Sequence, residues 1–240
     1  MSRGLGDVYK RQHAWETIGL CNTMLGDLEK LDPKALGVTD DELKQYIAEL
    51  RTMRAWAYYN NFELWGGALP LCTDTNGDIP GSADEDFNTG CKVIWNFMAD
   101  ELDACVDDLT AEDGSGATRN RMNQGINRML KMRLLLNSQL WTGVDRYKEC
   151  ADLCDEIIKG KYGTYGLVSD YREIYGINNQ ACQEVVFAFA MEAGMMTNNN
   201  RNTPYLPYNY DEMFGYSCDQ GGWNCVCMVP SKDNTGTLVP

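Results

Sequence analysis

The chain has 240 residues, enough to bury a substantial hydrophobic core, and its length is typical of one domain or part of one. Its 35 acidic residues outnumber the 21 basic ones and give a formal net charge of -14, which argues against binding to nucleic acid or to an anionic membrane surface. No apolar run is long enough to cross a bilayer.

The first residues of the chain, MSRGLGDVYKRQ, lack the apolar core of a signal peptide and resemble translated sequencing-adapter sequence. We therefore expect residues 1–12 to be a non-native leader. We also expect the natural N-terminus, with any lipoprotein signal and acylated cysteine, to be missing. The other end, from Thr237 to Pro240, has no capping element, so we predict that the chain is a fragment.

Hydrophobic periodicity predicts helices from His13 onward. The first covers about residues 13–31. The second is capped by Thr39 and Asp40 and runs to about Trp65, where two glycines can take positive φ and Pro70 prevents the helix from continuing. Helical spacing assigns its expected core face to Leu43, Ile47, Leu50, Met53, Ala57 and Leu64.

A loop over residues 72–84 is rich in Asp, Asn, Gly and Pro. Its oxygen donors copy several positions of an EF-hand calcium loop: Asp74, Asn76, Asp78 and Glu85. Ile79, however, occupies the place where that loop needs glycine for its sharp turn. A solvated turn without a metal is therefore the favoured interpretation.

Three further helices are expected at about residues 85–109, 122–141 and 145–159. The last two are separated only by a short break at Thr142 and Gly143, which predicts a helical hairpin whose apolar faces need further hairpins to cover them. The acidic pairs Asp100–Glu101 and Asp107–Asp108 are expected on the solvent face of the third helix. The fold class is therefore mainly α, with tetratricopeptide-like helix pairs and a loop-rich C-terminal tail.

The cysteines and the single histidine limit the chemistry that the chain can perform. Cys105, Cys150 and Cys154 fall on apolar helix faces and are expected to be buried thiols, whereas a disulfide among Cys218, Cys225 and Cys227 is left open. His13 is the only histidine, so a Ser-His-Asp triad or a histidine zinc site has almost no material. We expect no catalytic residue, metal or cofactor.

The residues around the end of the second helix resemble a signature of the SusD/RagB family of glycan-capturing outer-membrane lipoproteins. In that family an acidic-Leu-Arg-x-x-Arg-Ala helix leads through aromatic residues to a Gly-Gly-x-x-Pro-Leu exit. The matching positions here are Glu49, Leu50, Arg51, Arg54, Ala55, Gly66, Gly67, Pro70 and Leu71.

Later segments resemble the same family: Gly160–Gly163, then Asp170, Tyr171 and Tyr175, then the strand-like run Glu184–Phe189. Tyr175 stands where the family usually has Phe. The likeness covers about residues 13–224. We expect a SusD-like helical domain over 13–190 and a truncated, loop-rich, ligand-facing segment over 191–240.

The tail from Asn198 to Trp223 combines aromatic residues with Asn and Gly, without helical or alternating spacing. Rings on such a loop can stack on the apolar face of a pyranose, and Asn amides can bond its hydroxyls, although packing onto the helices below is the alternative for any single ring. The resemblance places Tyr205 and Trp223 at sugar-facing positions, with Asn202 and Asn224 beside them. These four are the predicted ligand-binding residues.

The resemblance implies a non-catalytic protein that binds a starch-type or other oligosaccharide at the cell surface and delivers it to a SusC-like TonB-dependent outer-membrane transporter. Attachment to the membrane would be through a lipid anchor missing from this chain. Two alternatives remain. One is a helical-repeat scaffold that binds a protein, and the other is a glycoside hydrolase, which needs two carboxylates converging on a cleft.

Overall fold

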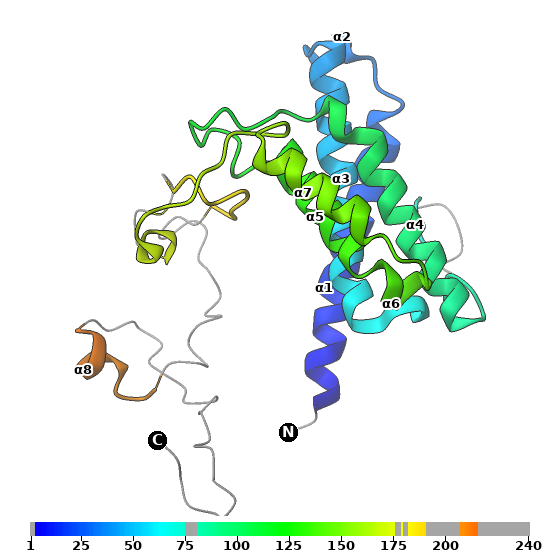
Figure 1. Ribbon diagram of the computed structural model, residues 1–240. Helices are drawn as coiled ribbons and strands as arrows, with labels where there is room; N and C mark the ends of the chain where they lie inside the picture. The colour runs from blue at the N-terminus through cyan, green and yellow to red at the C-terminus, as the bar shows by residue number, and fades with distance from the viewer. Residues whose placement is uncertain (1–2, 75–80, 176–178, 180–181, 191–206, 216–240) are drawn as a thin grey trace, which may run out of the picture. The chain divides into compact units, whose positions relative to one another are not determined.

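The computed structural model describes residues 3–74, 81–175, 179, 182–190 and 207–215 (Figure 1). The chain divides into two compact units, Met1–Ala188 and Phe189–Pro240. The α-helices are α1 (Arg3–Leu28), α2 (Pro33–Leu36), α3 (Asp40–Trp65), α4 (Phe87–Cys105), α5 (Gln124–Leu136), α6 (Ser138–Thr142), α7 (Tyr147–Ile158) and α8 (Tyr210–Phe214). The short 3-10 helices are η1 (Gly66–Ala68), η2 (Val106–Asp108) and η3 (Tyr171–Tyr175).

The mainly helical fold class is confirmed. Over the described ranges no β-strand forms, and the only β-type pairing is an isolated bridge between Glu112 and Gly163. The strand-like prediction for Glu184–Phe189 is wrong for this chain, because that segment is irregular and forms only scattered backbone bonds, such as Ala188 N to Arg119 O at 2.8 Å. None of the helices in the described part is long and apolar enough to cross a membrane.

Helices α1, α3, α4, α5 and α7 pack side by side in the first unit, each against the next in that order (Figure 1). Their shared core is built from fully buried side chains of several helices, among them Ile18, Tyr58, Phe62, Ile94 and Leu134. The predicted hairpin is present as α5 and α7. The single helix expected over 122–141 is instead broken at Asn137 into α5 and α6, and Gly143 closes α6 in the left-handed conformation.

Helix α1 begins at Arg3, well ahead of the expected start at His13. Part of the expected leader is therefore helical, and its non-native origin stays a prediction. Helix α3 begins as predicted: Thr39 accepts a hydrogen bond from Glu42 N at 3.1 Å, and Glu42 accepts one from Thr39 N at 2.8 Å. This reciprocal capping box fixes the N-terminus of the helix.

The glycines after α3 allow a close helix crossing. Gly66 has φ 54°, and a Cβ on Gly67 would lie 2.0 Å from the carbonyl oxygen of Phe87. On the other side of the contact, a Cβ on Gly90 would lie 2.5 Å from the Gly67 oxygen. The Gly-Gly exit therefore lets η1 pass directly against the first turns of α4, which no residue with a side chain would permit.

The buried face of α3 differs from the predicted one. Of the expected core residues only Ala57 is buried, and Leu64 is 61% exposed. The residues that are buried include three polar or charged side chains and three aromatic ones: Ala48, Thr52, Arg54, Ala55, Ala57, Tyr58, Tyr59, Asn61 and Phe62. The helix is rotated relative to its aliphatic stripe, because a polar network takes part of the buried face.

The cysteine predictions are confirmed where the structure describes them. Cys105 and Cys150 are buried free thiols, and Cys154 is a half-buried one. Cys105 lies in a small core cluster with Ala48 and Leu109. Burial raises the pKa of the Cys105 thiol, as expected for a thiol that acts as a small apolar side chain. Cys218, Cys225 and Cys227 lie outside the described residues.

Candidate functional site

The predicted ligand-binding residues Asn202, Tyr205, Trp223 and Asn224 lie outside the described residues, so their placement stays a prediction. Two tail rings are described: Tyr208 is 74% exposed, and Tyr210, the first residue of α8, is buried. The calcium-like loop is described only at its ends, through Asp74 and from Gly81 onward. Among described residues, no group of three or more His, Cys, Asp or Glu is placed to hold a metal ion.

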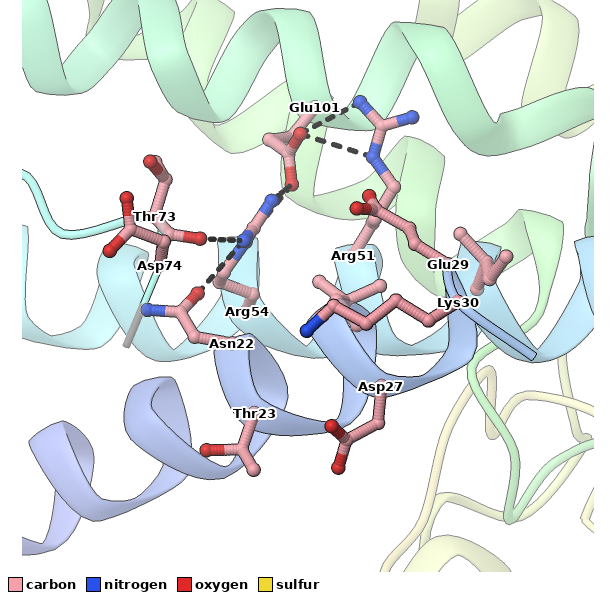
Figure 2. A pocket seen from close by; sticks show the side chains of 13 residues that line it. Asn22, Thr23, Asp27, Glu29, Lys30, Arg51, Arg54, Thr73, Asp74 and Glu101 are labelled. Atoms are coloured by element: carbon pink, nitrogen blue, oxygen red, sulfur yellow. Dashed lines mark hydrogen bonds and ion pairs between the residues drawn. The ribbon is translucent and has the colours of Figure 1, made fainter. Parts of the chain in front are cut away.

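The described part of the chain contains a polar cavity of about 530 Å³, shown in Figure 2. Its lining comes from the last turns of α1, the middle of α3, the segment after Leu71, and one residue of α4. The volume is within the usual range for small-molecule sites. Most of its side chains are polar or charged, unlike those of a typical drug-sized pocket.

Glu101 of α4 binds two arginines of α3 at the wall of this cavity (Figure 2). Its Oε1 accepts hydrogen bonds from Arg51 Nη2 at 2.7 Å and Nε at 3.1 Å, and its Oε2 accepts from Arg54 Nη2 at 2.5 Å and Nε at 3.1 Å. The remaining Nη1 of Arg54 donates to Asn22 Oδ1 at 2.8 Å and to the Thr73 carbonyl at 3.2 Å. The side chains of Arg54 and Glu101 are only 8% and 9% exposed.

These contacts overturn the expectation that Glu101 faces solvent. Asp100, by contrast, is exposed, as predicted. The sequence does contain a signal for the burial of Glu101. It lies on an apolar helix stripe whose members are spaced by four, three and four residues: Ile94, Met98, Glu101 and Cys105. A carboxylate at such a position is buried and needs a cationic partner. The two arginines of the family-like string provide that partner.

The same network anchors the start of the loop after α3. The Cys72 carbonyl accepts hydrogen bonds from Asn22 Nδ2 at 3.0 Å and from the Tyr58 hydroxyl at 2.9 Å, and Cys72 N donates to that hydroxyl at 2.8 Å. Burial raises the pKa of Tyr58, so its phenol remains protonated and able to donate. Helices α1, α3 and α4 are thereby tied to one loop segment.

The chemistry available at the cavity follows from this pairing. Both Glu101 oxygens accept hydrogen bonds from guanidinium groups, so neither oxygen is free to contact a substrate. The cavity lining carries three cations and four anions: Arg51, Arg54 and Lys30 against Asp27, Glu29, Asp74 and Glu101. The deepest charges neutralise one another, so the cavity is a structural polar core with a mixed-charge rim rather than an anion site.

Known proteins resemble this chain in sequence and in fold. No family model matches the chain. A curated relative, the starch-binding protein SusD of Bacteroides thetaiotaomicron, is 26% identical over 174 residues, which cover 71% of this chain and 29% of the relative. The chain thus spans less than a third of that protein's length.

Solved structures share the fold. A SusD superfamily protein from Bacteroides vulgatus matches with a TM-score of 0.65 at 18% identity over 85% of this chain and 40% of its own. A SusD-like protein from Bacteroides fragilis matches with a TM-score of 0.59 at 22% identity, over 77% of this chain and 34% of its own.

Surface glycan-binding protein A from Bacteroides thetaiotaomicron, solved in complex with laminarihexaose, matches with a TM-score of 0.57 at 18% identity, over 75% of this chain and 34% of its own. The matched sequence and the shared arrangement of helix pairs agree with the motif-based expectation. The chain is therefore similar in sequence to SusD over 174 residues and shares the fold of SusD-like proteins.

Proposed function

We propose that the protein binds neutral oligosaccharides at the cell surface without altering them, and passes them to a SusC-like TonB-dependent outer-membrane transporter. The observation that carries this proposal is the 174-residue match to a starch-binding protein, which extends over 71% of the chain. The complex of a fold neighbour with laminarihexaose also supports a sugar ligand. Surface location through a lipid anchor is part of the same proposal.

The charge of the chain is compatible with a neutral ligand. A formal net charge of -14 repels polyanions but has no effect on an uncharged sugar. Both oxygens of Glu101 are occupied by arginine hydrogen bonds, so this residue does not offer the free carboxyl group that a retaining or inverting glycosidase needs at its cleft. An assay that detects reducing ends released from starch or laminarin would establish hydrolysis and contradict this part of the proposal.

The proposed sugar contacts are those of Tyr205 and Trp223, with Asn202 and Asn224 bonding hydroxyls. Stacking that covers about 60 Å² of apolar surface on each ring contributes roughly 1.5 kcal/mol per ring. Ordering the glycan and fixing the complex oppose this gain, so net affinity should be near the millimolar range. Weak binding suits a protein that releases its ligand to a transporter.

Calorimetric titration of the full chain with maltohexaose and laminarihexaose tests the site. Tyr205→Ala with Trp223→Ala should weaken binding of whichever sugar binds, while the helical circular-dichroism signal stays unchanged. Tyr208→Ala is the matched control, because Tyr208 is an exposed ring of the same tail that is not among the predicted ligand-binding residues. Equal affinity of the double variant and the control would reject these site assignments.

A helical-repeat scaffold that binds a protein remains the alternative from a different functional class. Such a scaffold would bind its protein partner through the polar faces of the helix pairs rather than through the aromatic rings of the tail. Substituting Asp27 and Glu29, on the cavity rim, would then abolish the main interaction, whereas the glycan proposal expects no change in sugar affinity from those substitutions.

A further inference from the structure

Helix η3 carries a pair of exposed aromatic rings that no predicted site uses. Tyr171 and Tyr175 have ring centroids 5.3 Å apart and ring planes at 60°, and they are 69% and 72% exposed. Every other ring pair found in the described part of the chain contains a buried ring, namely Tyr58 or Phe62. Single exposed rings are ordinary, but two exposed rings held edge to face form a larger apolar surface than either ring alone.

The geometry of the pair is fixed by a hydrogen bond. The two phenol oxygens lie 2.9 Å apart, so each ring is held at its tip as well as at its backbone. The hydrogen bond with Tyr171 is the main cause that raises the pKa of Tyr175, so the Tyr175 phenol is neutral at pH 7. Two rings held at an angle lose little conformational entropy when a rigid ligand covers them.

Polar groups adjoin the rings. Glu184 is near enough to Tyr175 to act on it electrostatically, and its Oε2 is held by Val168 N at 3.1 Å. Arg172, between the two tyrosines in sequence, is fixed by hydrogen bonds from Nε and Nη2 to Asp170. Exposed ring faces near the fixed carboxylate of Glu184 suit the C–H faces and hydroxyls of a pyranose.

The exposed area favours a small ligand over a protein. Two tyrosines with about 70% of their surface free offer on the order of 300 Å². A stable protein interface needs about 800 Å² on each partner. A single sugar ring, by contrast, is covered by one or two aromatic side chains.

We infer that Tyr171 and Tyr175 form a second carbohydrate platform, which takes one pyranose ring of a neutral oligosaccharide independently of the tail residues. This inference rests on the proposed glycan-binding function. A second weak site on the same chain would raise the retention of long glycans through effective concentration.

Site-specific nitration of the full chain by tetranitromethane, mapped by peptide mass spectrometry, tests the platform with maltohexaose and laminarihexaose as probes. At about ten times the dissociation constant, a bound probe should slow nitration of Tyr171 and Tyr175 about tenfold, because roughly a tenth of the sites remain free. Tyr147, an exposed tyrosine of α7, is the internal control and should react at an unchanged rate.

Variants separate this inference from the tail site. Protection of Tyr171 and Tyr175 should persist in the Tyr205→Ala, Trp223→Ala double variant. In that background, Tyr171→Ala should weaken the remaining binding about tenfold, the factor for about 1.4 kcal/mol, whereas Tyr147→Ala should leave it unchanged. Tyr171→Phe, which keeps the ring and loses the phenol hydrogen bond, should weaken it less than Tyr171→Ala.

Four outcomes would overturn the platform. If a probe binds by calorimetry but protects neither tyrosine, the glycan function stands and the platform is rejected. Protection that disappears in the tail double variant makes the pair part of the tail site rather than a separate one. Slow nitration of both tyrosines without any sugar shows that they are covered already. If neither probe binds the wild type, the proposed function fails for these sugars and the platform fails with it.

Discussion

Removal of the Glu101 carboxylate should be one of the most destabilising single changes in the chain. Glu101→Ala leaves the Arg54 guanidinium, 8% exposed, with only the neutral acceptors Asn22 Oδ1 and Thr73 O. Breaking a buried ion pair by removing one partner costs about 3–5 kcal/mol, because an uncompensated charge remains buried. We expect a loss of that size in the free energy of unfolding.

The two arginines that bind Glu101 should contribute unequally to the free energy of unfolding. Arg51 keeps 30% of its side chain exposed, so water can hydrate its guanidinium when the carboxylate is absent. Arg51→Ala should therefore lower the free energy of unfolding less than Arg54→Ala does. Each substitution leaves Glu101 with one arginine, but only Arg54→Ala also removes the hydrogen bonds to Asn22 and Thr73. Glu101→Gln retains the shape but loses one acceptor oxygen and the charge, with an expected cost of about 1.5–3 kcal/mol.

Urea unfolding followed by far-UV circular dichroism measures these differences. Asp100→Ala is the matched control, because Asp100 is the exposed neighbour of Glu101 on the same helix, and it should change stability by less than about 0.5 kcal/mol. Replacing the pair together, as Arg54→Met with Glu101→Leu, should recover much of the loss, since buried ion pairs are often no more stable than apolar replacements. A Glu101→Ala cost equal to that of Asp100→Ala would refute the reasoning.

Three further predictions use the same unfolding assay or a chemical probe. Gly67→Ala should lower the free energy of unfolding by about 1–3 kcal/mol, because the new Cβ overpacks against α4. Gly19→Ala, in a helix with open space around it, should raise the free energy of unfolding by about 0.5–1 kcal/mol. The reverse order would contradict the close crossing of η1 and α4. Thr39→Ala removes the capping box of α3 and should cost about 1 kcal/mol, while an unchanged urea midpoint would show that the cap contributes nothing. Burial raises the pKa of the Cys21 thiol to about 11, so this thiol should be protonated at pH 8. Cys21 should therefore react with iodoacetamide more slowly than the half-buried Cys154. Equal alkylation rates of the two cysteines, measured by mass spectrometry, would contradict this prediction.

Local sequence signals predicted most of the helical scaffold. The Thr39 cap, the Gly-Gly exit and the apolar stripe of α4 act within a few residues of one another, so the sequence shows both their presence and their effect. The hairpin of α5 and α7 was recognisable for the same reason. The break at Asn137 was missed, because the apolar spacing continues across it.

Longer-range features escaped prediction. The run Glu184–Phe189 has the composition of a strand, but a strand needs a partner, and the described residues provide none. The exposure of the edge-to-face pair Tyr171 and Tyr175 depends on whether another surface covers the rings, which their spacing in the sequence does not reveal. The sugar-facing assignment of Tyr205 and Trp223 rests on family resemblance alone.

The sequence by itself determined most of the helices, the Thr39 cap and the likeness to SusD-like proteins, because these follow from contacts between near neighbours and from a recognisable residue string. The tertiary structure alone decided which face of α3 is buried. A guanidinium is tolerated in that interior only because a carboxylate about fifty positions further along the chain meets it there. The free energy of a buried charge is set by its partner in space, and spacing along one helix cannot specify that partner.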